Sequence, residues 1–324
     1  MPKTNKLVSI VISAYNEENN VAELYKQLKQ NLQNMPAIDF EFIYVDDGSS
    51  DKTLANCMAL QNEDERIKIV QLKRNFGHEI AMTAGMDYAQ GDAVIFMDAD
   101  LQHPPVYIPQ MIELWQQGKE IVLTKRLDNQ ATSKLYKFCA KTFYYVLNLL
   151  SETKIMESAP DFRLLDRKYV DFLKGFNEQD RLFRGLLSWI LPQENVAYID
   201  FVAPERFSGE SKYNFAKSLR LAINSILQFS VMPLRLATYL GLITAILAVC
   251  LGLYVFVEHF FLHNPTPGYA TIMVSVMFLG AVQLICLGII GEYIGKIHVE
   301  VKKRPLYMAE YMVKKGKKRA QKDI

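Results

Sequence analysis

The chain has 324 residues, of which 50% are hydrophobic and 22% charged, and its formal net charge at pH 7 is +2. This length exceeds one ordinary domain of about 150 residues, and the apolar fraction can form a sizeable core. The near-neutral balance argues against a disordered acidic or basic chain and against a general nucleic-acid-binding protein, so we expect no nucleic-acid partner. Four cysteines without paired or metal-type spacing are typical of a reduced, intracellular chain.

Residues 1–205 alternate short β-rich runs with amphipathic helical patterns. Such alternation predicts an α/β domain with a largely parallel sheet and helices on both faces. The first apolar run lacks the cleavage site of a secretory signal, so we expect it to be a buried strand of a cytoplasmic domain. The predicted strands are residues 7–13, 40–45, 67–72, 93–97 and 121–124.

Polar clusters follow three of these strands, where ligands bind in sheets of this kind. They begin at Ser13 (SAYNEE), Asp46 (DDGSSDKT) and Asp98 (DADLQHPP). On an extended chain, Asp98 and Asp100 point to the same side, and Gln102 continues the alternation. Because paired carboxylates suit Mg²⁺ or Mn²⁺ that also binds a diphosphate, we predict a metal site at Asp98, Asp100 and Gln102.

Single histidines and tryptophans receive structural interpretations. We expect His78 and His103 to stabilise turns, with ligand contact as the alternative. Trp115 and Trp189 are predicted to be core residues or membrane-proximal anchors.

Two apolar runs near the C-terminal end are each long enough to cross a bilayer. We predict spans at residues 233–262 and 269–295, joined by an extracytoplasmic hairpin at 263–268. Basic residues precede the first run, and residues 296–324 hold ten Lys or Arg against three Asp or Glu. The positive-inside rule therefore predicts a multi-pass protein of the plasma membrane with its N-terminal domain, both termini and a basic tail (296–324) in the cytoplasm. The alternative is a pair of buried helices in a large soluble domain.

Residues 206–232 precede the first span and include an amphipathic pattern from Lys212 to Phe229. This pattern predicts an interfacial juxtamembrane helix, with an ordinary surface helix as the alternative. Four glycines in the second run allow close helix packing, either within the chain or in a homo-oligomer.

The motifs SAYNEE, VDDGSSDKT, RNFG and DADLQHPP stand in the order found in the GT-A type glycosyltransferases of family 2, which the chain resembles. Further along, DFRLL from Asp161 and RFSGESK from Arg206, followed by two spans, look like the polyprenyl-phosphate sugar transferases. That group includes bactoprenol glucosyltransferases and dolichol-phosphate mannose synthases, and the resemblance covers about the whole chain. The sequence departs from the family pattern at Ser13, His78 and Pro160.

The resemblance implies a GT-A (Rossmann-like) domain that transfers a sugar, with inversion, from a nucleotide diphosphate to the phosphate of a membrane polyprenol. It implies glucose from UDP-glucose and undecaprenyl phosphate as first choices; UDP-N-acetylglucosamine, UDP-galactose and GDP-mannose stay open as donors. A processive polysaccharide synthase and a non-catalytic membrane scaffold are the competing functions. The sequence lacks the Gln-x-x-Arg-Trp motif of such synthases.

By matching position, the resemblance also assigns roles to individual residues. The nucleotide sugar would be held by Ser13, Tyr15, Glu17, Asp47 and Asp98, with Asp46 supporting the loop. Asp100 and Asp161 would be catalytic. Asp161 would orient the acceptor or take its residual proton, unless it is only a strand-end residue paired with Arg163 or a lysine.

An anionic acceptor requires cations near the membrane, because Arg and Lys bind phosphate oxygens. We expect Arg126 and Arg206 to bind the acceptor phosphate, together with Lys134, Lys137 and Lys212. A solvated face or a contact with anionic lipid is the alternative for the lysines.

Overall fold

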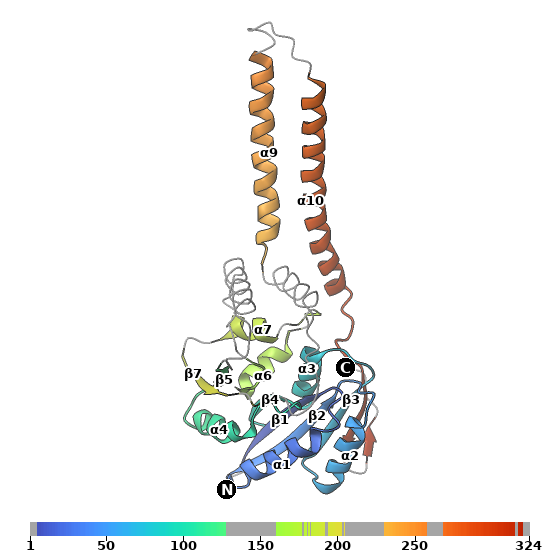
Figure 1. Ribbon diagram of the computed structural model, residues 1–324. Helices are drawn as coiled ribbons and strands as arrows, with labels where there is room; N and C mark the ends of the chain where they lie inside the picture. The colour runs from blue at the N-terminus through green and yellow to red at the C-terminus, as the bar shows by residue number, and fades with distance from the viewer. Residues whose placement is uncertain are drawn as a thin grey trace. The chain divides into compact units, whose positions relative to one another are not determined.

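The computed structural model describes residues 5–127, 160–176, 178–179, 181, 183–191, 194–202, 204, 230–257, 268–314 and 317–319 (Figure 1). The chain forms two units. The first unit contains the N-terminal part and the C-terminal segment from Arg304, and the second contains the residues from Phe215 to Lys303. The predicted helix from Lys212 to Phe229 lies outside the described residues.

A nine-stranded sheet forms the centre of the first unit, in the order β7-β5-β6-β4-β1-β2-β3-β8-β9. Parallel pairing joins β1 to β2, β1 to β4, β2 to β3 and β5 to β7, and the remaining pairs are antiparallel. The strands are β1 (Lys6–Ala14), β2 (Ile38–Asp46), β3 (Ile67–Leu72), β4 (Ala93–Asp98), β5 (Ile121–Arg126), β6 (Arg163–Asp166), β7 (Val196–Phe201), β8 (Ala309–Lys314) and β9 (Lys317–Arg319). All five predicted strands are confirmed, each within two residues of its predicted ends.

Helices cover both faces of this sheet, which confirms the predicted α/β class. One hydrophobic core includes residues of α1 (Val21–Leu32), α2 (Thr53–Glu63) and α4 (Ile108–Gln116), beside the short helix η1 (Pro105–Tyr107). The other includes residues of α3 (His78–Tyr88), α6 (Arg167–Lys174) and α7 (Phe183–Ile190). Within β1, Ile10 and Ile12 belong to the first core and Val11 to the second. The apolar run is therefore buried on both faces, as a central parallel strand requires.

The second unit contains two long apolar helices, α9 (Met232–Val257) and α10 (Tyr269–Val301). Their stretches Met232–Tyr254 and Ser275–Val301 have the length and composition of membrane spans, and most of their side chains are exposed. Both predicted spans are therefore helical where the structure describes them. The second helix continues six residues beyond the predicted end at Gly295.

The predicted basic tail at residues 296–324 is wrong as a separate segment. After the end of α10, the chain returns to the first unit, where β8 pairs antiparallel with β3 and β9 pairs with β8. The Tyr307 hydroxyl donates a hydrogen bond to Asp87 of α3 at 2.9 Å. Without β8, the edge of β3 would present unpaired backbone groups, and Lys-rich strands are common at sheet edges. Charge alone did not reveal this pairing.

A buried ion pair ties the amino-terminal halves of three strands together. Lys68 of β3 donates a hydrogen bond to Glu41 of β2, and both side chains are buried. Glu41 also accepts hydrogen bonds from the Ser9 hydroxyl and, at 2.7 Å, from the Gln90 backbone. Burial by itself raises the pKa of Glu41, but these hydrogen bonds outweigh it and hold the pKa below its usual range.

Replacing Glu41 should destabilise the first unit. We expect Glu41→Gln to lower the free energy of unfolding by about 3–5 kcal/mol, because it leaves the Lys68 charge buried without its counter-charge. The measurement is urea unfolding of the full chain in detergent, followed by the fluorescence of its two tryptophans, both in the first unit. Asp39→Asn, at an exposed residue near the start of the same strand, is the control and should change little.

The same pair predicts a pH dependence. A carboxylate with a lowered pKa stabilises the fold above its unfolded pKa and loses that contribution as the pH falls through the folded value. The wild-type protein should therefore lose stability below about pH 4, whereas Glu41→Gln should show a flatter profile there. Equal slopes for the two proteins would contradict the assignment.

Candidate active site

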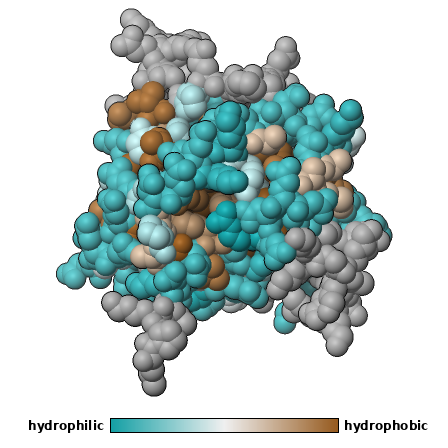
Figure 2. Space-filling view, turned by 90° about the horizontal axis from the view of Figure 1, so that it is seen from below, coloured by the Kyte–Doolittle hydropathy of each residue, from teal (hydrophilic) through white to brown (hydrophobic). Residues whose placement is uncertain are grey.

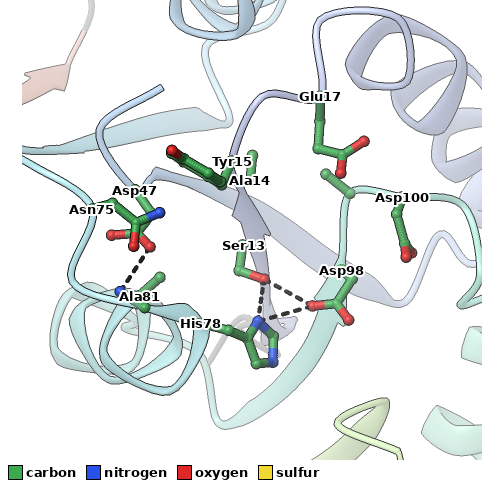
Figure 3. A pocket seen from close by; sticks show the side chains of 12 residues that line it. Ser13, Ala14, Tyr15, Glu17, Asp47, Asn75, His78, Ala81, Asp98 and Asp100 are labelled. Atoms are coloured by element: carbon green, nitrogen blue, oxygen red, sulfur yellow. Dashed lines mark hydrogen bonds and ion pairs between the residues drawn. The ribbon is translucent and has the colours of Figure 1, made fainter. Parts of the chain in front are cut away.

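A cavity of about 290 Å³ opens at the carboxyl ends of β1, β2 and β4 (Figure 3). Six of the residues predicted for substrate or metal binding line it: Ser13, Tyr15, Glu17, Asp47, Asp98 and Asp100. The other lining residues are Ala14, Asn75, Gly77, His78, Ala81 and Ala99. The polar clusters that are separate in the sequence therefore share one cavity.

Strand register brings these residues together. Parallel pairing of β1 with β4 places Ser13 opposite Asp98, and pairing of β1 with β2 places Ala14 opposite Asp46. The Ser13 hydroxyl donates a hydrogen bond to Asp98 at 2.8 Å. Hydrogen bonding across the strand ends thus fixes the direction of the Asp98 carboxylate.

The turn after β1 is bound to the turn after β2 by several hydrogen bonds. Asn16 adopts a left-handed conformation (φ 56°), and its side-chain carbonyl accepts from the Ser50 backbone at 2.9 Å. The Glu17 backbone donates to the Thr53 hydroxyl at 2.8 Å. These contacts hold Tyr15 and Glu17 at the cavity, where Tyr15 is 39% exposed.

Asp46 and Asp47 differ in what they hold. The buried Asp46 carboxylate accepts a hydrogen bond from the Ser49 backbone at 3.3 Å, which agrees with the predicted loop-supporting role. The Asp47 carboxylate lines the cavity and accepts from the backbones of Phe76 at 2.7 Å and Gly77 at 2.9 Å. Burial raises the pKa of both carboxyl groups, and these hydrogen bonds oppose the increase.

A glycine permits this close approach of two loops. Gly48 has a φ of +68°, and a Cβ atom there would lie 2.4 Å from the backbone carbon of Arg74. A side chain at this position would be strained and would push the loop of residues 74–77 away. The Asp47 contacts therefore depend on the glycine beside it.

The predicted alternation from Asp98 to Gln102 is wrong beyond the first residue. Strand β4 ends at Asp98, the chain turns at Ala99 and Asp100, and Leu101 is left-handed (φ 62°). Asp100 nevertheless lines the cavity, whereas Gln102 is absent from its lining and donates its backbone N–H to Asp100 at 3.0 Å. That Gln102 binds a metal ion through its side chain stays a prediction, but the extended-chain alternation that motivated it is absent.

The donor set fits a divalent ion that completes its coordination with a diphosphate. In the part of the chain that the structure describes, no group of three or more His, Cys, Asp or Glu side chains forms a metal site. Asp98 and Asp100 supply two carboxylates to the cavity, and Mg²⁺ is commonly bound by one or two carboxylates plus phosphate oxygens and water. Mg²⁺ or Mn²⁺ remains a prediction on this basis.

His78 joins two of the predicted site carboxylates, which the sequence did not reveal. Its Nδ1 lies 3.0 Å from the Ser13 hydroxyl and 3.2 Å from Asp98 Oδ1 (Figure 3). Its Nε2 lies 3.2 Å from Asp161 Oδ2. The other Asp161 oxygen accepts from the buried Arg163 guanidinium, which is the pairing expected under the alternative of a structural strand-end residue. The catalytic role of Asp161 stays a prediction. The expected turn-stabilising role for His78 is therefore incomplete. Its place directly after Asn-Phe-Gly, at the first turn of α3, was the only signal.

His103 does stabilise a turn, as expected. Its ring is buried, and its Nδ1 accepts the Asp98 backbone N–H at 2.9 Å. The ring stacks on Phe162 with centroids 5.3 Å apart, and burial lowers its pKa. His103 thus supports the end of β4 from behind the cavity.

The predicted acceptor-binding cations are placed only in part. Arg126 is exposed at the end of β5 and does not line the cavity. Lys134, Lys137, Arg206 and Lys212 lie outside the described residues.

Comparison with known proteins gives two family matches. Glycosyl transferase family 2 matches residues 9–173, and the GtrB C-terminal hairpin matches residues 232–297. An uncharacterized glycosyltransferase of Synechocystis is 43% identical over 93% of this chain and 94% of its own length. The SfII prophage-derived bactoprenol glucosyl transferase of Shigella flexneri is 40% identical over 93% of this chain and 96% of its own. A prophage bactoprenol glucosyl transferase homolog of Escherichia coli is 37% identical over 96% and 99%.

Removing the charge of Asp47 should loosen the loop that it holds. In Asp47→Asn, one of the two backbone N–H groups faces a weaker or missing acceptor, at a cost of about 1.5–3 kcal/mol for a hydrogen bond to a charged group. Amide exchange in peptides covering residues 74–80 should accelerate roughly ten- to hundredfold. Asp100→Asn, which changes the cavity carboxylate that accepts from the Gln102 backbone, is the control and should leave that exchange rate unchanged. Unaltered exchange in Asp47→Asn would contradict the assigned contacts.

Proposed function

Because the chain belongs to glycosyl transferase family 2, we propose that it transfers glucose from UDP-glucose to a membrane polyprenyl phosphate such as undecaprenyl phosphate. The observation that carries this proposal is the 40% identity to a bactoprenol glucosyl transferase over 93% of this chain and 96% of that protein. A likeness that extends through both units covers the donor domain and the apolar hairpin together. The reaction inverts the anomeric carbon and produces a lipid-linked glucose donor for the cell envelope.

The cavity supports binding of the nucleotide sugar. Its walls combine the aromatic ring of Tyr15 with the carboxylates of Glu17 and Asp47, and the hydrogen-bonded turns hold all three in place. Base and ribose present N–H and O–H donors that carboxylates accept. Asp98 and Asp100, which lie across the view of Figure 3 from Asp47, would face the diphosphate.

A divalent metal ion would be held by Asp98 and Asp100 with the donor diphosphate. Bound there, Mg²⁺ or Mn²⁺ supplies positive charge that stabilises the departing nucleoside diphosphate. The chain prepares this site itself, because Ser13 and His78 contact Asp98 and the Gln102 backbone donates to Asp100. Both carboxylates are thereby oriented before the donor arrives.

The acceptor needs little help from a general base. Its attacking group is a phosphate oxygen, and a phosphomonoester with a second pKa near 6 is largely dianionic at pH 7. Asp161 is buried and contacts both Arg163 and His78. This arrangement supports a role for Asp161 in orienting groups at the site rather than in removing a proton.

The connectivity of the chain supports a membrane hairpin with one cytoplasmic domain. The sheet of the first unit contains strands that precede α9 and strands that follow α10. Strands that share one sheet must lie on the same side of a membrane. Two spanning helices meet this requirement, because the second helix returns the chain to the side from which the first one started. This connectivity and the basic flanks together support a plasma-membrane protein whose catalytic domain and both termini lie in the cytoplasm.

The activity can be tested with purified full-length protein, undecaprenyl phosphate, Mg²⁺ or Mn²⁺ and a panel of labelled nucleotide sugars. We expect UDP-glucose to give a lipid carrying one hexose. Asp98→Asn and Asp100→Asn should abolish turnover without unfolding the protein, because each removes an anionic metal ligand and creates no core cavity. Asp200→Asn, an exposed carboxylate of β7, is the matched control and should keep wild-type activity.

The outcomes separate the competing functions. A polymer on the lipid would favour a processive synthase, and absence of product with every donor would favour a non-catalytic scaffold. Product from another nucleotide sugar alone would replace glucose as the transferred group. Near-normal activity of either aspartate variant at limiting metal would refute the metal assignment.

The topology has its own test. A cysteine at Thr266, between the two helices, should react with an impermeant thiol reagent added to intact cells, whereas one at Lys318 of β9 should not. Lys318→Cys should become labelled after permeabilisation, which controls for its intrinsic reactivity. Labelling of Lys318→Cys from outside intact cells would overturn the cytoplasmic placement of the catalytic domain.

A further inference from the structure

Three aromatic side chains form a cluster, here called the aromatic patch: Phe172 of α6, Trp189 of α7 and Phe176, two residues after the end of α6. Phe176 is half-buried, and the other two side chains are exposed. Phe172 is 53% exposed and Trp189 is 62% exposed. The Phe172 and Trp189 rings stack with centroids 6.5 Å apart, and Phe176 meets both rings edge to face, at 5.4 Å and 5.7 Å. Exposed aromatic rings that contact one another form a contiguous apolar patch, and such patches mark interaction surfaces, whereas single exposed apolar residues are ordinary.

The patch is held rigidly by a buried arginine. Arg181 donates hydrogen bonds to the Thr83 hydroxyl of α3 at 3.0 Å and to the carbonyl oxygens of Leu173 and Phe176. The turn between α6 and α7 is therefore fixed to the body of the first unit. A preformed patch loses little conformational entropy when it binds.

The patch lies on the side of the sheet to which the chain returns from α10. Residues of α6 and α7 belong to the same hydrophobic core as Ala309 at the start of β8. Three residues beyond Phe176, Gln179 donates a hydrogen bond to the Arg304 carbonyl at 2.6 Å. Arg304 comes three residues after the last residue of α10. The segment that follows the patch residue Phe176 is thus hydrogen-bonded to the first residue of the C-terminal segment of the first unit.

The opposite side of the first unit has a different character. Figure 2 shows the molecule from below the view of Figure 1, and hydrophilic residues cover most of that face. Helices α1 and α2 lie toward it in Figure 1. Exposed aromatic rings on one side and a mainly hydrophilic opposite side are expected of a domain that rests on a membrane.

We propose that the aromatic patch inserts into the headgroup region of the bilayer that α9 and α10 span. This inference rests on the membrane attachment under the proposed function. Trp and Phe favour the boundary between headgroups and acyl chains, where an amphipathic indole ring finds both apolar and polar surroundings. The covalent connection to α10, which ends three residues before Arg304, would also keep the bilayer at a high effective concentration near the catalytic unit. The contact would hold the catalytic unit at the level of the acceptor phosphate.

Tryptophan fluorescence tests the contact directly, because the chain has only two tryptophans and Trp115 is buried. The full-length protein and its Trp189→Phe variant are reconstituted into vesicles of phosphatidylcholine and phosphatidylglycerol, and flotation verifies their incorporation. The difference between the two proteins gives the emission of Trp189. We expect brominated lipids to remove most of this emission, and aqueous iodide to quench it weakly.

A matched reporter on another surface serves as the control. Val106 is 60% exposed on η1, beside the core that contains α1 and α4, and Val106→Trp in the Trp189→Phe background places an indole there. Its emission should be quenched by iodide and not by brominated lipid. If Trp189 behaves like this control in floating vesicles, the patch proposal is overturned while membrane attachment stands. Shielding of Trp189 from both quenchers would indicate that a protein covers the patch and would equally overturn the patch proposal. Protein that fails to float with the vesicles would refute the membrane attachment as well.

A kinetic readout links the patch to the reaction. Replacing two of its rings, in Phe172→Ser with Trp189→Ser, should raise the apparent KM for vesicle-borne polyprenyl phosphate roughly tenfold, equivalent to ~1.4 kcal/mol. The KM for the nucleotide sugar should stay the same, because the patch does not line the donor cavity. Val106→Ser should change neither constant. An unchanged acceptor KM in the double variant would contradict the proposal.

Discussion

The parallel register of β1 with β2 and β4 is the constraint on which the candidate site depends. It sets Ser13 beside Asp98 and Ala14 beside Asp46, so that three polar clusters meet at one edge of the sheet. A shift of one residue would turn every side chain of β1 to the other face and separate the Ser13 hydroxyl from Asp98. Because β1 is buried on both faces, such a shift would also exchange its side chains between the two hydrophobic cores, and the packing of those cores thereby protects the site geometry.

Helix α3 is connected by hydrogen bonds and ion pairs to carboxylates from several parts of the site. Asp47 holds the backbone just before the helix, and His78 in its first turn contacts Asp98 and Asp161. A Cβ atom at Gly85 would lie 2.2 Å from Val11, so the helix packs on β1 more closely than any side chain at that position allows. Asp47, Asp98 and Asp161 are consequently parts of one packed assembly rather than of independent loops.

The C-terminal segment that follows α10 is built into the sheet of the first unit. Strand β8 covers the edge of β3, and Tyr307 bonds to Asp87 of α3, the helix that begins at the cavity. The domain is therefore joined to the apolar helices at two points in its fold, one before α9 and one after α10.

The sequence by itself determined the five central strands, the polar clusters after them and the two long apolar helices, because hydrophobic periodicity and length are local properties. Family motifs identified six of the twelve residues that line the cavity. Only the tertiary structure placed β8 on β3, ended the alternation at Asp98 and brought His78 between Asp98 and Asp161. These features depend on contacts between residues 20 to more than 200 positions apart, and on a left-handed Leu101, for which a single sequence carries no periodic signal.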